Sequence, residues 1–425
     1  MSSASASTAC AGCTAACADG VTAATPAAAH ARRPGPVLVG MKTFHIVVLG
    51  AGYTGLMAAL GAARRTRRLG GRVTLVNPSS RFTERLRMHQ IASGQSLADR
   101  RISHLIAGSG IEFVEGWARR LDPEARTVLV HGPGAEREIG YDIAVIALGS
   151  VADTVTVPGA DAHAFTLDSP HTAARLAERL AAEPGGAVAV VGAGLTGVEA
   201  ASEIAERHPG GEVVLLGREE PGPLMSGPAR EYLGRALHRL GVRVRAGVEV
   251  AKVLPTGVEL VGGEIVPAAA VLWTTGFSAR PLAREAGLAV DERGRVLVDA
   301  TLRSVSHPEI YAVGDSAAIR QAWGTIHGTC QSGIPTGAYA ADAIARRLRG
   351  RPVKPFRFGY FHQPVSLGRK DAVIQFTHPD DSPRKFFLKG RAAVLYKELV
   401  TSSPPPTYRL SRRIALPASA FVIKA

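Results

Sequence analysis

The chain has 425 residues, of which 46% are hydrophobic, and this is enough for two or three globular domains with buried cores. No run of about 18 or more apolar residues occurs, so we expect no membrane-spanning helix. The net charge of +14 is carried mostly by scattered arginines, which fit nucleotide phosphates, an acidic partner or an anionic membrane face. No nucleic-acid-binding motif accompanies them.

Residues 1–40 are rich in alanine, serine and threonine, and we expect a disordered low-complexity tail there. Its three cysteines, Cys10, Cys13 and Cys17, are followed by no fourth ligand at a fitting spacing, so we predict bystander thiols and no metal site. Met41 stands directly before the first predicted strand. Translation that starts there, leaving the tail unmade, is the simple hypothesis.

A buried strand that turns into a helix is predicted at residues 44–56, FHIVVLGAGYTGL, where an aliphatic run meets three glycines. In such a turn Gly50 permits the tight bend, Gly52 lets the backbone approach a pyrophosphate, and Gly55 lets helix and strand pack closely. The phosphates then lie at the helix N-terminus, where free N–H groups favour negative charge. This turn predicts a bound dinucleotide.

Polar side chains follow the second predicted strand, residues 72–76. Asn77 stands where a carboxylate usually receives the ribose hydroxyls, and its amide can still bond one without charge assistance. Arg85, His89 and Gln90 either begin a solvated basic helix or line a ligand cavity. The pattern leaves both interpretations open.

Strands and turns alternate before the next motif. Residues 111–116 and 127–130 favour strands, and Gly132-Pro133-Gly134 favours a hairpin turn. Pro158-Gly159 marks a boundary, and residues 169–182 favour a helix that leads into a second nucleotide motif.

The glycine turn recurs after the run VAVV, where Gly192, Gly194 and Gly197 stand in the same register. Two buried strands that end in glycine, at Gly149 and Gly276, repeat as well, so the duplication extends beyond the turns. We therefore predict an α/β fold with two Rossmann-like dinucleotide-binding domains, and two bound nucleotides.

The nucleotide preference of the second turn depends on the strand at 212–216, which ends in Gly217-Arg218 rather than in an acid. A carboxylate there selects the free 2′-hydroxyl of NADH, whereas a neighbouring arginine accepts the 2′-phosphate of NADPH, so Arg218 favours NADPH or dual use. Glu199 either complements the helix dipole or points toward the nicotinamide end. Spacing alone does not separate these roles.

Residues 310–315, Ile-Tyr-Ala-Val-Gly-Asp, complete a pattern that resembles the flavoproteins with two dinucleotide-binding domains. Together with the two glycine turns, the resemblance covers roughly residues 41–350. It implies FAD in the first domain, with Asp315 bonded to the ribityl chain, and NAD(P)H in the second. It also implies that the FAD domain is split by the inserted nucleotide domain.

Two features of the chain indicate its branch within that superfamily: an absent cysteine pair and two matching motifs. No cysteine occurs between Met41 and Thr329, which excludes the redox-active pair of the disulfide reductases. The Gly197-Val198-Glu199 continuation and residues 329–337 resemble type II NADH dehydrogenases and the related apoptosis-inducing-factor-like quinone reductases.

That resemblance gives a role to Gln331, which by motif position lies beside the isoalloxazine and shapes the quinone site. The helix that follows, after Pro335, would aim its N-terminus at the flavin. Cys330 stands where these dehydrogenases usually have alanine, and we expect no nucleophile there because no motif supplies an activating base.

The C-terminal residues are predicted to form a small interface domain with strands at 365–367 and 372–376. Residues 386–399 form an amphipathic helix that either docks on a membrane surface, as in membrane dehydrogenases of this type, or packs over the flavin domain. Because Gly390 interrupts the apolar face, we favour packing. The predicted divisions are the tail 1–40, FAD domain 41–157 and 284–350, NAD(P)H domain 158–283 and interface domain 351–425.

The expected reaction is hydride transfer from NAD(P)H to the flavin, followed by electron transfer to a quinone or another small acceptor, with Glu199, Gln331 and His89 as candidate catalytic residues. One alternative is a ferredoxin or rubredoxin reductase, since a basic surface suits an acidic iron–sulfur carrier. The other is a redox-responsive flavoprotein with little turnover. We expect a cytoplasmic protein; peripheral contact with the inner face of the membrane and a homodimer stay open.

Overall fold

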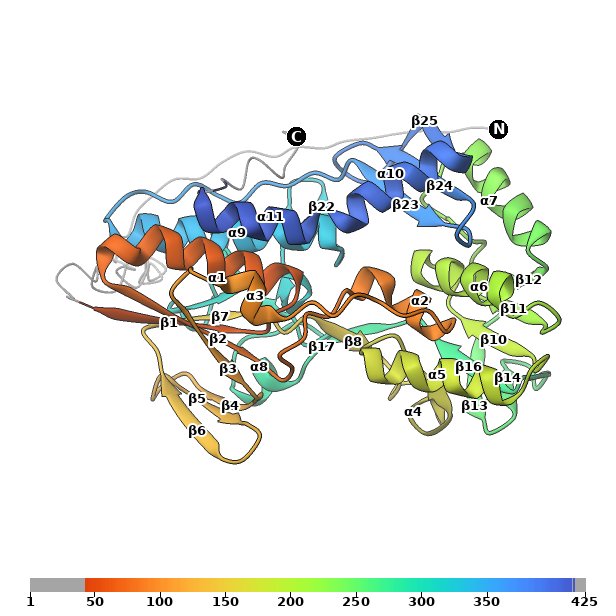
Figure 1. Cartoon of the computed structure of the whole chain (residues 1–425), viewed down its shortest axis with the longest axis horizontal. Coiled ribbons are helices and arrows are strands. Elements are labelled where there is room, and N and C mark those ends of the chain that lie inside the picture. The colour runs from red at the N-terminus through yellow and green to blue at the C-terminus, as the bar shows by residue number, and fades with distance from the viewer. Residues whose placement is uncertain (1–42, 415, 417–425) are drawn as a thin grey trace, which may run out of the picture. The chain divides into compact units, whose positions relative to one another are not determined.

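The computed structural model describes residues 43–414 and 416, and two five-stranded parallel sheets organise it (Figure 1). The first sheet has the strand order β19-β7-β1-β2-β3, with bounds Ile310–Ala312, Ile143–Ile146, Phe44–Leu49, Gly71–Asn77 and Ile111–Glu115. All six residues of β1 are buried, because helices and loops cover both of its faces. The predicted tail at 1–40, with its cysteines, lies outside the described residues.

The second parallel sheet repeats this plan with the order β12-β11-β10-β16-β9, whose bounds are Val242–Arg245, Val213–Leu216, Val188–Val191, Ala270–Trp273 and Ala164–Phe165. Its helices are α5 (Pro170–Ala182), α6 (Leu195–Arg207) and α7 (Gly227–Arg239). The prediction of an α/β fold with two Rossmann-like halves is therefore confirmed. Strand β19 follows the second sheet in sequence but pairs with β7 of the first, so the first sheet is built from segments on both sides of the second.

Helices α1 (Tyr53–Thr66) and α9 (Cys330–Leu348) pack closely on the same side of the first sheet (Figure 1). Small residues make this approach feasible. A Cβ added at Gly61 would lie 2.7 Å from the Cβ of Ala341, and one added at Gly337 would lie 2.4 Å from the carbonyl oxygen of Thr54. The long helix α9 is thereby fixed with its N-terminal end beside the start of α1.

Two antiparallel strands connect the sheets: β8 (Ser150–Ala152) leaves the first sheet, and β17 (Phe277–Ala279) returns beside it. The remaining elements are short. Three-stranded antiparallel sheets comprise β4 (Trp117–Asp122), β5 (Thr127–His131) and β6 (Glu136–Gly140), and β13 (Val250–Leu254), β14 (Gly257–Leu260) and β15 (Ile265–Pro267). Others are η1 (Arg67–Leu69), η2 (Arg85–Arg87), α2 (Met88–Ala92), α3 (Ile102–Ile106), α4 (Ala160–His163), α8 (Leu282–Glu285), β18 (Val296–Leu297), η3 (Gly314–Ser316), β20 (Ala317–Ala318), β21 (Arg320–Gln321) and β22 (Gly324–Thr325).

The C-terminal part forms a separate antiparallel sheet of β23 (His362–Ser366), β24 (Ala372–Thr377) and β25 (Pro383–Lys389), followed by α10 (Gly390–Ser402) and α11 (Pro404–Arg413). The expected helix over 386–399 is wrong in its first part, because those residues complete β25. Gly390, with φ +65°, begins α10 instead of interrupting it.

The helix that does form, α10, packs mainly on the small C-terminal sheet, and it meets the predicted FAD domain through Glu398 and Ser402, which accept hydrogen bonds from Arg87. The buried Ala393 of α10 packs on β24 of the small sheet. The helix that covers α1 is α11, where the fully buried Tyr408 donates a hydrogen bond from its hydroxyl to the carbonyl of Tyr53, at 3.0 Å. Its sequence, PPPTYRLSRR, has too short an apolar repeat to predict this contact.

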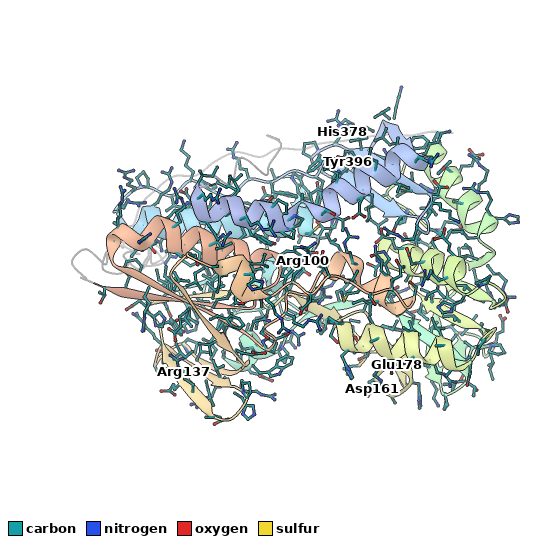
Figure 2. All side chains as sticks on the ribbon, in the orientation of Figure 1. Arg100, Arg137, Asp161, Glu178, His378 and Tyr396 are labelled. Atoms are coloured by element: carbon teal, nitrogen blue, oxygen red, sulfur yellow. The ribbon has the colours of Figure 1, made fainter. Side chains whose placement is uncertain are left out.

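Charged side chains mark the periphery of the fold. Arg137 on β6 and Asp161 on α4 are exposed and project outward (Figure 2). Among the described residues, no helix is both long enough and apolar enough to cross a membrane.

Candidate active site

The first glycine turn has the geometry that its sequence predicts. Gly50 takes φ +100°, and a Cβ there would lie 2.4 Å from the carbonyl oxygen of Ala147. A Cβ on Gly55 would lie 1.8 Å from the carbonyl oxygen of Gly50, so neither position tolerates a side chain. Gly52, at the N-cap of α1, faces open space, with no atom within 4 Å of an added Cβ.

The second turn repeats each of these features. Gly192 takes φ +114°, a Cβ on Gly197 would lie 1.8 Å from the carbonyl oxygen of Gly192, and Gly194 faces open space. Neither α1 nor α6 has a side-chain cap or an acidic residue in its first turn. Free N–H groups at two open helix ends are the donor set that two pyrophosphates require. The residues present therefore fit a dinucleotide at each turn.

One cavity of about 2780 Å³ joins the two glycine turns. Ligand pockets commonly occupy about 300–1,000 Å³, so this volume is enough for two nucleotides and an acceptor. Ten predicted site residues line it: Gly50, Gly52, Asn77, Arg85, His89, Gly149, Gly194, Glu199, Asp315 and Gln331. Five do not: Gly55, Gly192, Gly197, Arg218 and Gly276.

Asn77 contacts the protein rather than presenting a free amide. Its Oδ1 accepts a hydrogen bond from the backbone N–H of Ala51 at 2.9 Å, and its Nδ2 donates to the carbonyl of Ser79 at 2.8 Å. The side chain thus holds the first glycine turn against the end of β2. The expected ribose contact stays a prediction, and the observed bonds give asparagine a structural role that a carboxylate could fill only in part.

Asp315 lies where the chain returns to the first sheet. Its Oδ2 accepts a hydrogen bond from the hydroxyl of Ser150 at 2.7 Å, and Gly328 lies so close that an added Cβ would be 2.3 Å from Oδ1. The neighbouring Ser316 accepts a hydrogen bond from the N–H of Gly149 at 3.0 Å. Two segments far apart in sequence therefore fix this carboxylate at the cavity wall, and Ser150 is a partner that the sequence did not reveal.

Gln331 does not present its amide to the cavity. Its Nε2 donates to the carbonyl of His362 and its Oε1 accepts from the N–H of Phe361, both at 2.9 Å. Helix α9 begins at Cys330, capped by Thr329, so the expectation of a helix start after Pro335 is wrong by more than one turn. Gln331 thus ties the first turn of α9 to residues 360–364, which line the cavity from the C-terminal sheet.

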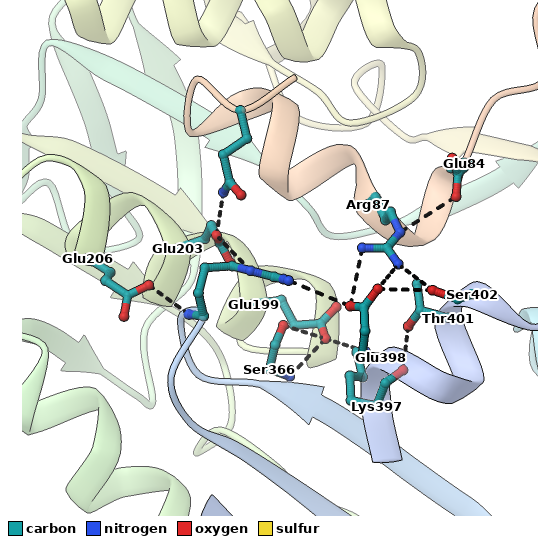
Figure 3. A network of polar contacts seen from close by, with 12 residues as sticks. Glu84, Arg87, Glu199, Glu203, Glu206, Ser366, Lys397, Glu398, Thr401 and Ser402 are labelled. Atoms are coloured by element: carbon teal, nitrogen blue, oxygen red, sulfur yellow. Dashed lines mark hydrogen bonds and ion pairs between the residues drawn. The ribbon is translucent and has the colours of Figure 1, made fainter. Parts of the chain in front are cut away.

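Glu199 on α6 contacts both β23 and α10 of the C-terminal part (Figure 3). Its Oε1 accepts hydrogen bonds from Lys397 Nζ at 2.5 Å, from the Ser366 N–H at 2.9 Å and from the Ser366 hydroxyl at 3.0 Å. The lysine also donates to the carbonyl of Pro364 at 2.9 Å. Glu199 is the fifth residue of α6, beyond the first turn, so complementing the helix dipole does not explain it.

Electrostatics keep Glu199 ionised. Burial raises the pKa of its carboxyl, but Lys397, together with the Ser366 hydrogen bonds, outweighs burial and holds that pKa below its ordinary value. A buried carboxylate paired with a lysine whose side chain is 13% exposed therefore borders the cavity, and a carboxylate in such a place needs a partner of this kind.

His89 completes this group from α2. It is 4% exposed, and its Nδ1 lies 3.9 Å from Glu199 Oε2, while its Nε2 has no hydrogen-bond partner among the described residues. Burial lowers the pKa of His89 to about 4, so the imidazole is neutral at pH 7. A neutral imidazole next to a carboxylate can accept or relay a proton.

His89→Asn is expected to flatten the dependence of unfolding free energy on pH. The folded pKa of about 4 lies below the ordinary histidine pKa of 6.5, so between these pH values the unfolded chain binds a proton that the folded chain does not. Stability is therefore complete above pH 6.5 and is lost toward pH 4, by about 3 kcal/mol from this residue. Urea unfolding at pH 7 and pH 5 measures this change in unfolding free energy, and His131→Asn, at an exposed site, is the control. If the unfolding free energies of the wild type and His89→Asn changed equally between the two pH values, the lowered pKa of His89 would be contradicted.

Ion pairs also join the segment before α2 to α10 (Figure 3). Arg87 donates hydrogen bonds to Glu398 and, at 3.0 Å, to Ser402, and its Nε lies 3.5 Å from Glu84. Arg85 instead turns toward β8, donating to the carbonyl of Ser150 at 3.0 Å. The predicted basic stretch is thus neither freely solvated nor wholly directed at a ligand, and its arginines hold the walls of the cavity together.

Cys330 gives no sign of nucleophilic activation. It stands at the start of α9, where burial raises the pKa of its thiol to about 11, so it stays protonated at pH 7. The expectation of an unreactive cysteine agrees with this environment.

These features define a flavoprotein oxidoreductase with two dinucleotide-binding folds. Residues 44–341 match the pyridine nucleotide-disulphide oxidoreductase family, and the chain belongs to that family. It is therefore an FAD-dependent NAD(P)H oxidoreductase, although no cysteine between residues 41 and 329 serves disulfide chemistry.

Similar proteins span nearly the whole chain. An NADH dehydrogenase-like protein of Mycobacterium tuberculosis is 32% identical over 378 residues, covering 84% of this chain and 93% of the relative. A demethylphylloquinone reductase of Synechocystis is 28% identical over 395 residues, covering 87% and 94%. Among solved structures, NDH2 from Plasmodium falciparum in complex with NADH superposes with a TM-score of 0.73 at 15% identity, covering 87% and 98%, which establishes the shared fold.

Proposed function

We propose that the protein is an NAD(P)H:quinone oxidoreductase. The observation that carries the proposal is that a single cavity connects both open helix ends, at Gly52 and Gly194, with a wall built by the C-terminal sheet. That wall includes Phe361 and Pro364, which suit a flat apolar acceptor, and the Glu199–Lys397 pair, which suits proton exchange. The relatives named for quinone reduction support this acceptor class.

The chain's own residues hold the reactants in place. The N–H groups at the start of α1 would bind the FAD pyrophosphate, and those of α6 the pyrophosphate of NAD(P)H. Asp315 would bond the ribityl chain, and Gln331 holds the 360–364 segment in position. Bound FAD supplies the chemistry that accepts a hydride pair from the nicotinamide and passes the electrons to an acceptor.

The test is a visible spectrum of the purified protein followed by anaerobic mixing. We expect a yellow protein whose absorbance bleaches with NADH or NADPH and returns on adding a quinone. A protein that bleaches but is reoxidised only by ferredoxin or rubredoxin would support the iron–sulfur reductase alternative. Failure of both nucleotides to bleach it would overturn the proposal.

Arg218→Ala is expected to raise KM for NADPH roughly tenfold, equivalent to about 1.4 kcal/mol, and to leave KM for NADH nearly unchanged. Its side chain is 75% exposed and pairs only loosely with Glu249, at 3.9 Å, so it is available to a 2′-phosphate. Steady-state kinetics with both nucleotides measure the effect, with exposed Arg235→Ala on α7 as control. Equal changes for the two nucleotides would refute the role.

We further propose that α10 meets a membrane surface, where a lipid-soluble quinone would be available. Leu395 and Leu399, one helical turn apart, are 74% and 70% exposed, and the exposed Arg391 stands one turn before Leu395 on the same helix. Sedimentation with anionic lipid vesicles tests this. The double variant Leu395→Ser/Leu399→Ser should lower the bound fraction, whereas Ile265→Ser, at an exposed site on β15, should not; equal binding would contradict the proposal.

A further inference from the structure

His362 on β23 is a buried polar residue in the wall of the cavity. It is 4% exposed and stands between Phe361 and Pro364, the residues that suit a flat acceptor. Gln331 bonds the N–H of Phe361 and the carbonyl of His362, both at 2.9 Å. Lys397 bonds the carbonyl of Pro364 at 2.9 Å. The backbone that carries the imidazole is therefore fixed from α9 on one side and from α10 on the other.

Tyr396 on α10 contacts one of the two ring nitrogens of His362 (Figure 2). The Nδ1 atom lies 2.8 Å from the tyrosine hydroxyl oxygen, and the two rings meet edge to face with centroids 5.5 Å apart. Burial raises the pKa of Tyr396, so its hydroxyl keeps its proton at pH 7. A phenol O–H is a stronger donor than a neutral imidazole N–H. The hydroxyl of Tyr396 therefore donates, and Nδ1 of His362 accepts.

This contact decides which nitrogen of His362 carries the proton. Burial lowers the pKa of the imidazole to about 4, and the charge of Lys397 acts in the same direction, so the ring is neutral at pH 7. Because Nδ1 accepts from Tyr396, the single ring proton is on Nε2. Nε2 makes no hydrogen bond to any described residue, yet it is not sealed inside the protein as the Nε2 of His89 is. A fixed N–H donor without a protein partner thus borders the cavity.

The surroundings of this donor match an oxygen on the edge of a flat ring. A buried donor left unpaired costs free energy, so a ligand that completes the hydrogen bond gains affinity from it. The ring of Phe361 lies against the imidazole, with centroids 4.0 Å apart, and offers an apolar face beside the donor. A quinone has a flat apolar ring with carbonyl oxygens at its edge. These oxygens gain negative charge as electrons arrive, and a hydrogen bond to them then strengthens.

We propose that the Nε2–H of His362 donates a hydrogen bond to a carbonyl oxygen of the quinone, and that Tyr396 is the positioning residue that keeps the proton on Nε2. The bond orients the quinone against the cavity wall and stabilises the charge that reaches its oxygen with the electron pair. His362 contacts the acceptor, whereas Tyr396 acts only through His362. The inference rests on the proposed function, because it assigns a donor to the acceptor of that reaction.

Two substitutions of His362 separate the donor from the ring that carries it. His362→Leu removes the donor, whereas His362→Gln keeps an amide N–H that can reach the position of Nε2. With menadione as the quinone, kcat/KM should fall about 10²-fold in His362→Leu and stay within about threefold of the wild type in His362→Gln. Reduction of ferricyanide, which needs no hydrogen bond to a carbonyl oxygen, should stay within about twofold in both. His378→Leu, at an exposed site in the turn after β24, is the matched control and should change neither rate.

Tyr396→Phe tests the positioning role. The change removes one hydroxyl and keeps the ring that packs edge to face on Phe376. We expect kcat/KM for menadione to fall about threefold, because the proton of His362 is then shared between its two ring nitrogens. Nitrogen-15 NMR of histidine-labelled protein at pH 7 measures this directly: the His362 proton should be on Nε2 in the wild type and on either nitrogen in the variant. Loss of packing alone would not move the proton.

A readout independent of turnover comes from infrared spectroscopy of menadione bound to the oxidised protein. The carbonyl that accepts the hydrogen bond should absorb at lower frequency than the other carbonyl. His362→Gln should keep this difference between the two bands, and His362→Leu should remove it.

The outcomes separate this inference from the proposed function. A wild type that is bleached by NAD(P)H but reduces ferricyanide and no quinone would reject the proposed function. A wild type that reduces menadione, with His362→Leu equally fast or His362→Gln as slow as His362→Leu, would overturn the role of His362 alone. Should His362→Leu fail to fold, the wild type decides: two unshifted carbonyl bands, or a ring proton on Nδ1, would overturn it.

Discussion

Gly52→Val is expected to yield a folded chain that binds no flavin. An added Cβ at this position meets no protein atom within 4 Å, and the backbone, with φ −73° and ψ −169°, is extended and suits any residue. The unfolding free energy should therefore change by no more than about 0.5 kcal/mol for the protein without flavin. The valine would instead fill the open face of the α1 N-terminus, where the pyrophosphate has to approach the backbone. Flavin absorbance per chain, before and after incubation with FAD, measures the loss.

Two other glycines give this experiment its controls. Gly194→Val, at the equivalent position of the second turn, should leave the protein yellow but prevent bleaching by either nucleotide. Gly55→Ala should fail to fold stably, because its Cβ would lie 1.8 Å from the carbonyl oxygen of Gly50. A yellow Gly52→Val protein with normal flavin content would show that the first turn is not the FAD site.

The parts of this fold that the sequence predicts are those set by local chemistry. A run of aliphatic residues ending in a glycine that needs positive φ can hardly form anything other than a buried strand with a tight turn, and both β1 with Gly50 and β10 with Gly192 follow that rule. The repeat of this unit then specifies the two sheets, because parallel strands joined by a crossover helix have few alternative arrangements. The α/β prediction depends on these constraints alone.

The parts that the sequence does not predict are contacts between distant segments. Lys397 lies 198 residues after Glu199, and nothing in the sequence near either residue indicates that the two will pair. Gln331 was placed by motif position beside the flavin, but its amide bonds the backbone at residues 361 and 362. The partners of a side chain depend on tertiary packing, and local sequence patterns do not specify which distant segments pack together.

The helix at the C-terminus shows a different limit. Residues 386–389 have apolar and basic side chains that fit a helical face and an edge strand equally, and pairing with β24 decides for the strand. Short apolar runs are ambiguous in this way because four residues are too few to show whether the apolar side chains recur with the helical or the strand period. Membrane docking is one of the two alternatives that the sequence offers for residues 386–399, and the exposure of Leu395 and Leu399 on α10 is what favours it.

Lys397→Met is expected to destabilise the protein by about 3–5 kcal/mol at pH 7. Methionine fills similar space but leaves the Glu199 carboxylate, whose side chain is only 12% exposed, with Ser366 as its remaining hydrogen-bonded partner. A buried charge that loses its counterion is among the most costly changes a single substitution makes. Urea unfolding at pH 7 measures the loss, and quinone reduction should fall with it, because Glu199 and Lys397 both form part of the cavity wall.

The pH dependence of this variant identifies the cause. Without the lysine, burial should raise the folded pKa of Glu199 above its unfolded value, so the protonated form is stabilised below the unfolded pKa and the benefit is lost as pH rises through the folded one. The deficit of Lys397→Met should therefore shrink as pH falls, while Lys397→Met/Glu199→Gln should regain most of the stability at pH 7. A double variant no more stable than the single one would show that the lysine acts through packing along α10 and not through its charge.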